Sequence, residues 1–171
     1  MPPTVKRKIA MLGGFSVGKT SLVSTFVRSM FSEKYQTTVG VRVDKKDVSV
    51  DNDRVTLLIW DLHGEDNIFE IPATYLRGSA GYLLVVDGTR PETLKTACGL
   101  KDRVQDLIGP TPFVLLLNKS DLADEWKIDE SALKKLKDQG WHLIKTSAKT
   151  GAGVEDAFAA LARAMLRTSP P

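Results

Sequence analysis

Cysteine is scarce in this sequence, with Cys98 the single one among 171 residues. One cysteine excludes a framework of internal disulfides and fits the reducing cytosol, so we expect a cytoplasmic protein. The thiol is expected to be a small core or surface side chain rather than a nucleophile.

Signals for membrane attachment are missing as well. The N-terminus, MPPTVKRK, has no apolar signal core, and Pro2 stands where N-myristoylation requires glycine. The C-terminus, RTSPP, has no cysteine for prenylation. We therefore expect neither a lipid anchor nor membrane insertion.

The sequence also lacks a strong excess of one charge. It has 24 Lys and Arg against 21 Asp and Glu, a net charge of +3, and both signs are scattered along the chain. Without a basic patch we expect no nucleic-acid partner. The length predicts a single domain over residues 1–171 with its core at about 6–167, and we find no internal repeat.

Apolar runs alternate with amphipathic stretches. The predicted buried strands are 8–12, 55–60, 81–87, 112–118 and 141–147. The predicted helices are 19–29, 92–108, 129–139 and 154–166. A hairpin breaks the alternation, because residues 41–50 and 54–60 are joined only by residues 51–53. The pattern predicts an α/β fold whose six-stranded, mostly parallel sheet has one antiparallel strand and helices on both faces.

The stretch GGFSVGKTS (13–21) follows a predicted strand and opens a predicted helix. In this context the G-x4-G-K-T pattern predicts a phosphate-binding loop whose backbone N–H groups and helix N-terminus face the anion. Lys19 would meet the outer phosphates, and the Thr20 hydroxyl can ligate Mg²⁺. The alternative is a glycine turn followed by an ordinary surface lysine.

Two further stretches supply chemistry at strand ends. In IWDLHGED (59–66), Asp61 ends an apolar strand and suits a partner of Mg²⁺, although D-x-x-G by itself is also a common turn. In NKSD (118–121), the Asp121 carboxylate can accept from the two guanine donors, N1–H and the exocyclic amine, which adenine does not offer. The alternative for NKSD is a turn that caps the next helix.

Five motifs in order give the sequence a resemblance to the Ras superfamily of small GTPases, and to its Rab-like branch. They are GGFSVGKTS, YQTTVGV (35–41), WDLHGED (60–66), NKSD and TSAK (146–149), and YLRGSAG (75–81) resembles a further Rab-type segment. The resemblance implies the G-domain fold of P-loop GTPases, binding of GTP or GDP with Mg²⁺, and hydrolysis of GTP. A compact chain of this kind also fits a bacterial or archaeal member.

The resemblance assigns roles residue by residue. The implied nucleotide-binding residues are Gly13, Phe15, Ser16, Val17, Gly18, Lys19, Thr20, Ser21, Phe31, Tyr35, Thr38, Asp61, Gly64, Asn118, Lys119, Asp121, Ser147, Ala148 and Lys149. The implied magnesium ligands are Thr20, Thr38 and Asp61, and the implied catalytic residues are Lys19, Gly64 and Glu65. Phe31 would lie edge-on to guanine, or instead staple the helix end to the core. Effectors and regulators are expected to bind through the switch regions, 32–40 and 62–77.

The sequence departs from the family where hydrolysis takes place. Glu65 replaces the glutamine that orients the attacking water, and Phe15 and Ser16 replace small residues, commonly glycine or serine at the first and glycine at the second. These changes predict slow hydrolysis. The alternative for Phe15 is that its ring folds back onto switch residues such as Leu62 or Ile68 and blocks nothing. His63 is expected to face solvent.

Three functions follow from these patterns. The first is a guanine-nucleotide switch, and the second is a module that holds GTP without hydrolysing it and recruits partners. The third, an ATP-using enzyme, shares the phosphate loop but not NKSD and SAK. Arg42 and Arg77 stay open as candidates for an arginine supplied in cis.

Overall fold

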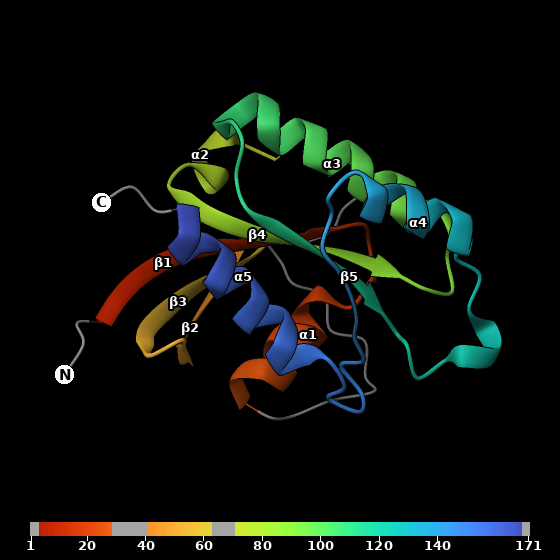
Figure 1. Cartoon of the computed structure of the whole chain (residues 1–171), viewed down its shortest axis with the longest axis horizontal. Helices are drawn as coiled ribbons and strands as arrows, with labels where there is room; N and C mark the ends of the chain where they lie inside the picture. Colours follow the sequence, from red (N-terminus) through yellow and green to blue (C-terminus); the bar gives the residue numbers. More distant parts are fainter. Residues whose placement is uncertain (1–3, 29–40, 63–70, 169–171) are drawn as a thin grey trace.

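The computed structural model describes residues 4–28, 41–62 and 71–168. Its three layers are a twisted sheet and a layer of helices on each face (Figure 1). In chain order the elements are β1 (Thr4–Gly13), α1 (Lys19–Arg28), β2 (Val41–Val50), β3 (Asp53–Leu62), α2 (Ala73–Leu76), β4 (Ser79–Asp87), α3 (Glu92–Ile108), β5 (Phe113–Asn118), the short 3₁₀ helix η2 (Ala123–Glu125), α4 (Glu130–Asp138), β6 (Leu143–Lys145) and α5 (Val154–Thr168).

The sheet has six strands in the order β2-β3-β1-β4-β5-β6. β1 lies between β3 and β4 and is parallel to both, and β5 and β6 continue the parallel pairing. Only β2, at the edge, runs antiparallel to its neighbour β3. The predicted fold class is therefore confirmed.

The hairpin between β2 and β3 is tighter than predicted. Val50 pairs with Asp53, so the turn consists of Asp51 and Asn52 alone instead of three residues. Both have positive φ, 51° and 71°, which is the geometry of the two-residue turn that matches the twist of antiparallel strands. Aspartate and asparagine tolerate this conformation better than most residues.

Element ends differ from the predictions by a few residues. Helix α4 begins at Glu130 because Asp129 is its N-cap, whose carboxylate accepts a 3.0 Å hydrogen bond from the backbone N–H of Ser131. Strand β6 covers only three residues of the predicted 141–147. The four-residue helix α2 was not predicted, because one turn is too short to show a helical period.

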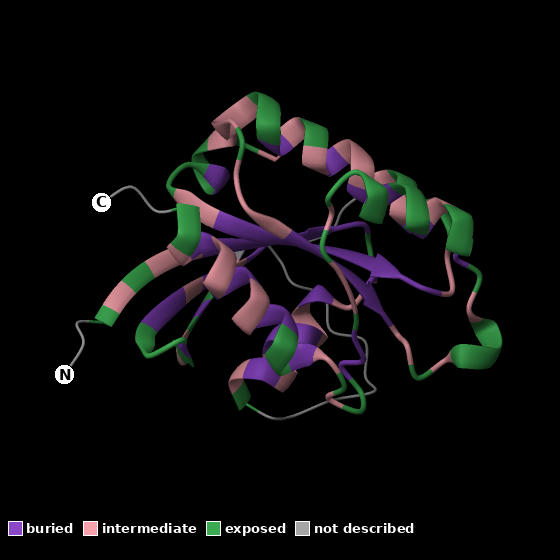
Figure 2. Cartoon of the chain, viewed as in Figure 1, coloured by how far each residue is buried: buried purple, intermediate pink, exposed green. Residues whose placement is uncertain are grey.

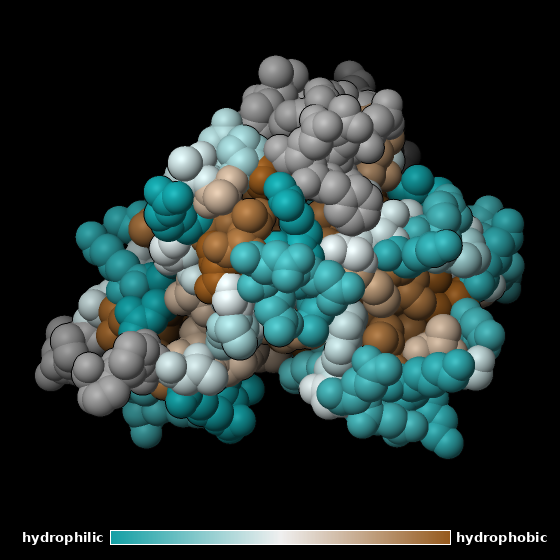
Figure 3. Space-filling view, turned by 90° about the horizontal axis from the view of Figure 1, so that it is seen from above, coloured by the Kyte–Doolittle hydropathy of each residue, from teal (hydrophilic) through white to brown (hydrophobic). Residues whose placement is uncertain are grey.

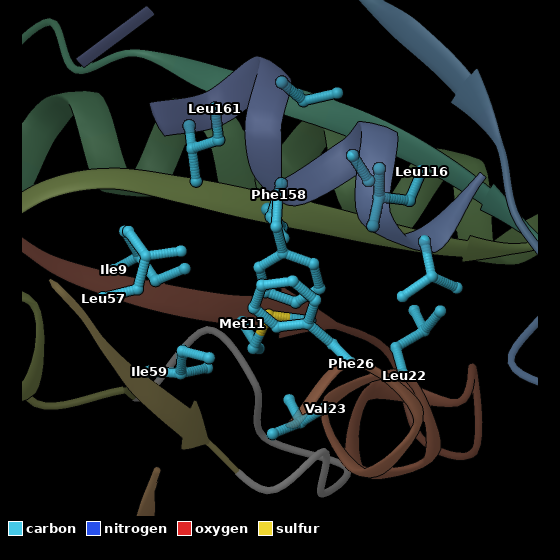
Figure 4. Packing of buried hydrophobic residues seen from close by; sticks show 14 of the residues in the cluster. Ile9, Met11, Leu22, Val23, Phe26, Leu57, Ile59, Leu116, Phe158 and Leu161 are labelled. Carbon is cyan, nitrogen blue, oxygen red and sulfur yellow. The ribbon is translucent and has the colours of Figure 1, made fainter. Parts of the chain in front are cut away.

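The central strands β4 and β5 and the second half of β1 are buried on both faces, whereas the edge strand β2 is partly exposed, and the helices are exposed on their outer sides (Figure 2). Side chains alternate between the faces, so Ile9 and Met11 of β1 pack toward α1 and α5, and Ala10 and Leu12 pack toward α3 and α4. On the first face the rings of Phe26 and Phe158 stack with centroids 3.8 Å apart (Figure 4). Burying each ring stabilises the fold by roughly 1.5–3 kcal/mol, which fixes α1 against α5.

The topology brings the polar ends of the strands together. Because β1, β3, β4, β5 and β6 are parallel, the segments that follow them leave the sheet at one edge. Ligands of α/β proteins bind at this edge. Elsewhere, hydrophilic residues cover much of the face seen from above, with hydrophobic ones between them (Figure 3).

Candidate functional site

The glycine loop connects β1 to α1 and lies against the segment that follows β5. Gly18 has a φ of 104°, and a Cβ atom there would clash with the Asn118 side-chain nitrogen. Asn118, buried at the end of β5, donates a 2.9 Å hydrogen bond to the carbonyl of Val17. Glycine at position 18 therefore lets the loop and the NKSD segment touch directly.

Lys19 is the buried cation of the loop, with only 6 % of its surface exposed. Its Nζ donates to the carbonyls of Gly13 and Gly14 at 3.1 and 3.2 Å. Burial lowers the pKa of Lys19 to about 8, against the attraction of Asp61. Carbonyl oxygens do not neutralise an ammonium group, so the site electrostatically favours an anion such as phosphate.

Asp61, at the end of β3, is fully buried beside the start of α1. Its Oδ2 accepts a 2.6 Å hydrogen bond from the Thr20 hydroxyl, whereas its Oδ1 has no hydrogen-bond partner. Burial raises the pKa of Asp61, and the Thr20 hydrogen bond and the charge of Lys19 oppose this shift. A buried carboxylate with a free oxygen next to a hydroxyl is a donor set that suits a hard divalent cation.

The NKSD segment is fixed on both sides. The Asn118 oxygen accepts from the Thr146 hydroxyl at 3.1 Å, and Lys119 donates to the carbonyl of Ser16 at 3.1 Å. Asp121 is exposed, and its Oδ1 accepts from the Ser147 hydroxyl at 2.8 Å. The Asp121 carboxylate is thus oriented and still accessible, as recognition of a base requires.

The TSAK segment lies beside NKSD and α1. The carbonyl of Ala148 accepts a 2.7 Å hydrogen bond from the Thr25 hydroxyl, and Ser147 and Ala148 are buried. Lys149 is exposed, and Ser21 lies partly buried in the first turn of α1. The structure therefore brings together the predicted residues from positions 13–21, 61, 118–121 and 147–149.

Phe15, in the middle of this loop, has 49 % of its surface exposed. In the alternative for Phe15, its ring folds back onto residues such as Leu62. The structure shows Leu62 buried in the core beneath α2 and α3. Ser16 has a φ of 58°, a conformation that glycine adopts at lower cost.

Several predicted residues lie outside the described part of the chain. They are Phe31, Tyr35, Thr38, His63, Gly64, Glu65 and Ile68. Of the two candidate arginines, Arg42 forms an ion pair with Asp44 at 3.2 Å, and Arg77 is exposed at the end of α2.

Three residues at the site had no role predicted from the sequence: Asp87, Arg90 and Thr146, the last of which lies in the TSAK motif. Asp87 ends β4 fully buried, with Lys119 Nζ 2.8 Å and Arg90 Nε 3.0 Å from its Oδ2. Burial would raise the pKa of Asp87, but hydrogen bonds from Lys119, Thr89 and Arg90 outweigh it and lower the pKa to about 2. The signal was present, because Asp87 ends the apolar run GYLLVVD just as Asp61 directly follows VTLLIW.

Comparisons with known proteins agree with this geometry. The model of the Ras family matches residues 8–167. The Ras-related protein Rab5 of Nicotiana tabacum is 34% identical over 165 residues, which are 95% of this chain and 82% of that protein. The Ras-related protein Rab-7b of Mus musculus is 35% identical over 168 residues, 95% of this chain and 84% of that protein. Rab-7b of Paramecium octaurelia is 34% identical over 169 residues, 92% and 80% of the two chains.

Among the described helices, none combines the length and the apolar character needed to cross a lipid bilayer.

Proposed function

The chain belongs to the Ras family of small GTPases, with Rab-like relatives, and on this premise we propose which of its residues bind the base, the phosphates and Mg²⁺ and which take part in hydrolysis. It is a small GTP-binding protein that acts as a guanine-nucleotide switch and hydrolyses GTP. The observation that supports the assignment of residues best is the contact between the phosphate loop and NKSD, through Asn118 and the carbonyl of Val17.

For the base, we assign recognition of guanine to Asp121. Its carboxylate is exposed and held by Ser147, while Asn118 and Lys119 connect it to the loop. Ser147, Ala148 and Lys149 close the pocket from the other side, and Phe31 is proposed to lie edge-on to the ring.

Asp121→Asn tests this assignment, because an amide donor suits the extra oxygen of xanthine. We expect affinity to move from GDP toward xanthosine diphosphate, measured by competition with a fluorescent guanine nucleotide. The matched control is Asp124→Asn, an exposed acid on η2, which should keep guanine preference. Unchanged preference in the Asp121 variant would exclude this residue as the base reader.

For the phosphates, we assign Gly13–Ser21, with Lys19 reaching the outer phosphates. We place Mg²⁺ at Thr20 and Asp61, with Thr38 as a further ligand, because the free Oδ1 of Asp61 and the adjacent hydroxyl fit a hard cation. No cluster of three acidic, histidine or cysteine side chains gathers among the described residues. The ion, when bound, neutralises phosphate charge.

For hydrolysis, we assign water positioning to Glu65 and stabilisation of the terminal phosphate to Lys19 and the Gly64 N–H. A carboxylate at position 65 repels the γ-phosphate and has no amide donor, so we propose that turnover is slow. We propose that Phe15 adds a steric obstacle, because its large side chain is 49 % exposed and is not packed in the core.

Single-turnover hydrolysis of GTP tests the slow rate. We expect Glu65→Gln and the double variant with Phe15→Gly to hydrolyse at least about tenfold faster than the unmodified protein. Val43→Ala removes another exposed hydrophobic side chain and should leave the rate unchanged. If no variant accelerates hydrolysis, Glu65 and Phe15 do not limit it. The same assay, run with and without cell extract, separates slow turnover from a module that holds GTP permanently.

For partners, we propose that effectors and regulators bind through residues 32–40 and 62–77. Within the second region, Tyr75 is an exposed aromatic residue of α2. Placement in the cytoplasm stays an expectation from the composition.

A further inference from the structure

Three side chains bind backbone carbonyls of the phosphate loop, and one of them, Arg90, belongs to none of the nucleotide motifs. Arg90, in the turn between β4 and α3, donates a 2.6 Å hydrogen bond from its guanidinium to the carbonyl of Phe15. Lys119 donates to the next carbonyl, that of Ser16, and Asn118 to the one after, that of Val17. Three consecutive carbonyls of the loop are thus each bound by a side chain from another part of the chain.

These contacts set the direction of the loop's N–H groups. A trans peptide is planar, and its N–H points opposite to its C=O. None of the described peptide bonds is cis. Holding the carbonyls of residues 15, 16 and 17 from outside therefore directs the N–H groups of Ser16, Val17 and Gly18 to the opposite side, which is the side that binds phosphate.

The loop needs such support. Ser16 lies in the left-handed region with a φ of 58°, which costs a non-glycine residue about 1–2 kcal/mol. A residue in this conformation persists only where its surroundings impose it. The hydrogen bonds from Arg90 to the Phe15 carbonyl and from Lys119 to the Ser16 carbonyl supply that constraint, because these two carbonyls belong to the peptide groups before and after the Ser16 Cα.

Asp87 holds the two cations that make these bonds. Its Oδ2 lies 3.0 Å from Arg90 Nε and 2.8 Å from Lys119 Nζ. Its Oδ1 accepts from the backbone N–H and the hydroxyl of Thr89, at 2.9 and 2.7 Å. The backbone N–H of Asp87 in turn donates a 3.0 Å hydrogen bond to the Thr93 hydroxyl oxygen. Both carboxylate oxygens are satisfied, so the group is fixed and can fix its partners.

We infer that Asp87 and Arg90 are positioning residues of the phosphate loop: Asp87 orients Arg90 and Lys119, which hold the loop's carbonyls so that its N–H groups face the β-phosphate. The inference rests on the proposed function, because it assigns this loop to the phosphates of a guanine nucleotide. It also implies that Arg90 fixes the orientation of the Phe15 carbonyl through their hydrogen bond.

The test compares GDP with GMP, which lacks the β-phosphate. In Arg90→Ala we expect the affinity for GDP to fall about threefold to tenfold while that for GMP, measured by competition, stays within about twofold. Arg90→Lys keeps a cation beside Asp87 and should recover part of the loss. In the GDP complex of Arg90→Ala, the backbone amide resonances of Ser16 and Val17 should also shift.

Arg163→Ala is the matched control. Arg163 pairs with Asp51 at 3.1 Å on the exposed surface between α5 and the hairpin turn, away from the site. We expect its affinities for GDP and GMP to equal those of the unmodified protein.

The outcomes separate the inference from the proposed function. If GDP and GMP affinities fall by the same factor in Arg90→Ala, or if neither falls, the positioning role is wrong while nucleotide binding stands. If the unmodified protein prefers ADP to GDP, the assignment of the site to guanine nucleotide fails instead. Asp87→Asn repeats the comparison of GDP and GMP affinities at the second positioning residue. If Asp87→Asn does not fold, the result for Arg90→Ala decides.

Discussion

Two buried carboxylates flank the phosphate loop, Asp61 at the end of β3 and Asp87 at the end of β4, and they are held in opposite ways. Asp87 has both oxygens bound and two cations within 3.0 Å, and its pKa is lowered. Asp61 receives one bond from a neutral hydroxyl, keeps one oxygen free, and its pKa is raised by burial.

The difference separates a structural carboxylate from one reserved for a ligand. A buried charge is stable when protein cations and donors satisfy it, as at Asp87. In the described part of the chain Asp61 forms no ion pair, accepts one hydrogen bond, from Thr20, and has an unpartnered Oδ1, so we propose that a bound divalent cation balances its buried charge.

The largest expected effect is on the stability of the nucleotide-free protein. Asp87→Asn should lower the free energy of unfolding by about 3 kcal/mol, because Arg90 and Lys119 lose the charge they share. Asp61→Asn should raise it by up to about 1 kcal/mol, because it removes a buried charge whose desolvation outweighs the attraction of Lys19. Urea unfolding with EDTA measures both. Changes of the same sign and size would abolish the distinction between the two carboxylates.

Removal of magnesium gives the next effect. Chelation should speed GDP release from the unmodified protein by about tenfold or more, which corresponds to at least about 1.4 kcal/mol. Asp61→Asn should release GDP quickly with or without chelator. Asp87→Asn should keep the ratio between the release rates with and without chelator that the unmodified protein shows. Stopped-flow fluorescence of a labelled GDP provides the rates. A chelator effect of full size in Asp61→Asn would show that Asp61 does not hold the ion.

Acid should remove the contribution of Asp87. Its folded pKa of about 2 lies below the ordinary 3.8, so the folded state binds fewer protons between these values and stability falls as pH falls. The difference in unfolding free energy between the unmodified protein and Asp87→Asn therefore includes about 2 kcal/mol that is present above pH 4 and lost as pH falls through 2.

Denaturant titrations at a series of pH values measure this difference. The control is Asp51→Asn, whose exposed ion pair with Arg163 should be worth less than about 1 kcal/mol at any pH. A difference for Asp87→Asn that stays constant down to pH 2 would mean that the charge of Asp87 does not stabilise the fold.

The smallest effect concerns Thr89. Thr89→Ala removes one hydroxyl bond to Asp87 and keeps the backbone bond, so we expect a loss of about 1 kcal/mol in thermal or urea unfolding. Thr74→Ala, at an exposed position of α2, is the control and should change stability by less than about 0.5 kcal/mol. An equal effect of the two substitutions would indicate that the Thr89 hydroxyl adds nothing to Asp87.

Much of the fold could be predicted from the sequence because its signals are local. The run VTLLIW is continuous and apolar, so it predicts a strand buried on both faces, and Pro91 and Gly109 bracket the helix found at 92–108. The turn at Asp51 and Asn52 was predicted one residue too long, since the residue pattern does not show which backbone positions take positive φ.

The candidate site was predictable where it is built from motifs. Lys19, Asp61, Asn118 and Asp121 lie together as their order implied. Asp87 and Arg90 were not predicted, because Arg90 reaches a carbonyl 75 positions earlier in the chain, and no local pattern indicates which backbone group a distant side chain will meet.

The sequence by itself determined the order of strands and helices, the ligand-binding motifs and the two acids at strand ends, because each depends on neighbouring residues. Only the tertiary structure decided which of the two acids is satisfied. That depends on the order of the strands, because β4 pairs with β5, which places Asp87 beside Lys119, and β3 pairs with β1, which leaves Asp61 beside the Thr20 hydroxyl. The energy of a buried charge is set by the groups that surround it in space, and these come from segments far apart in the chain.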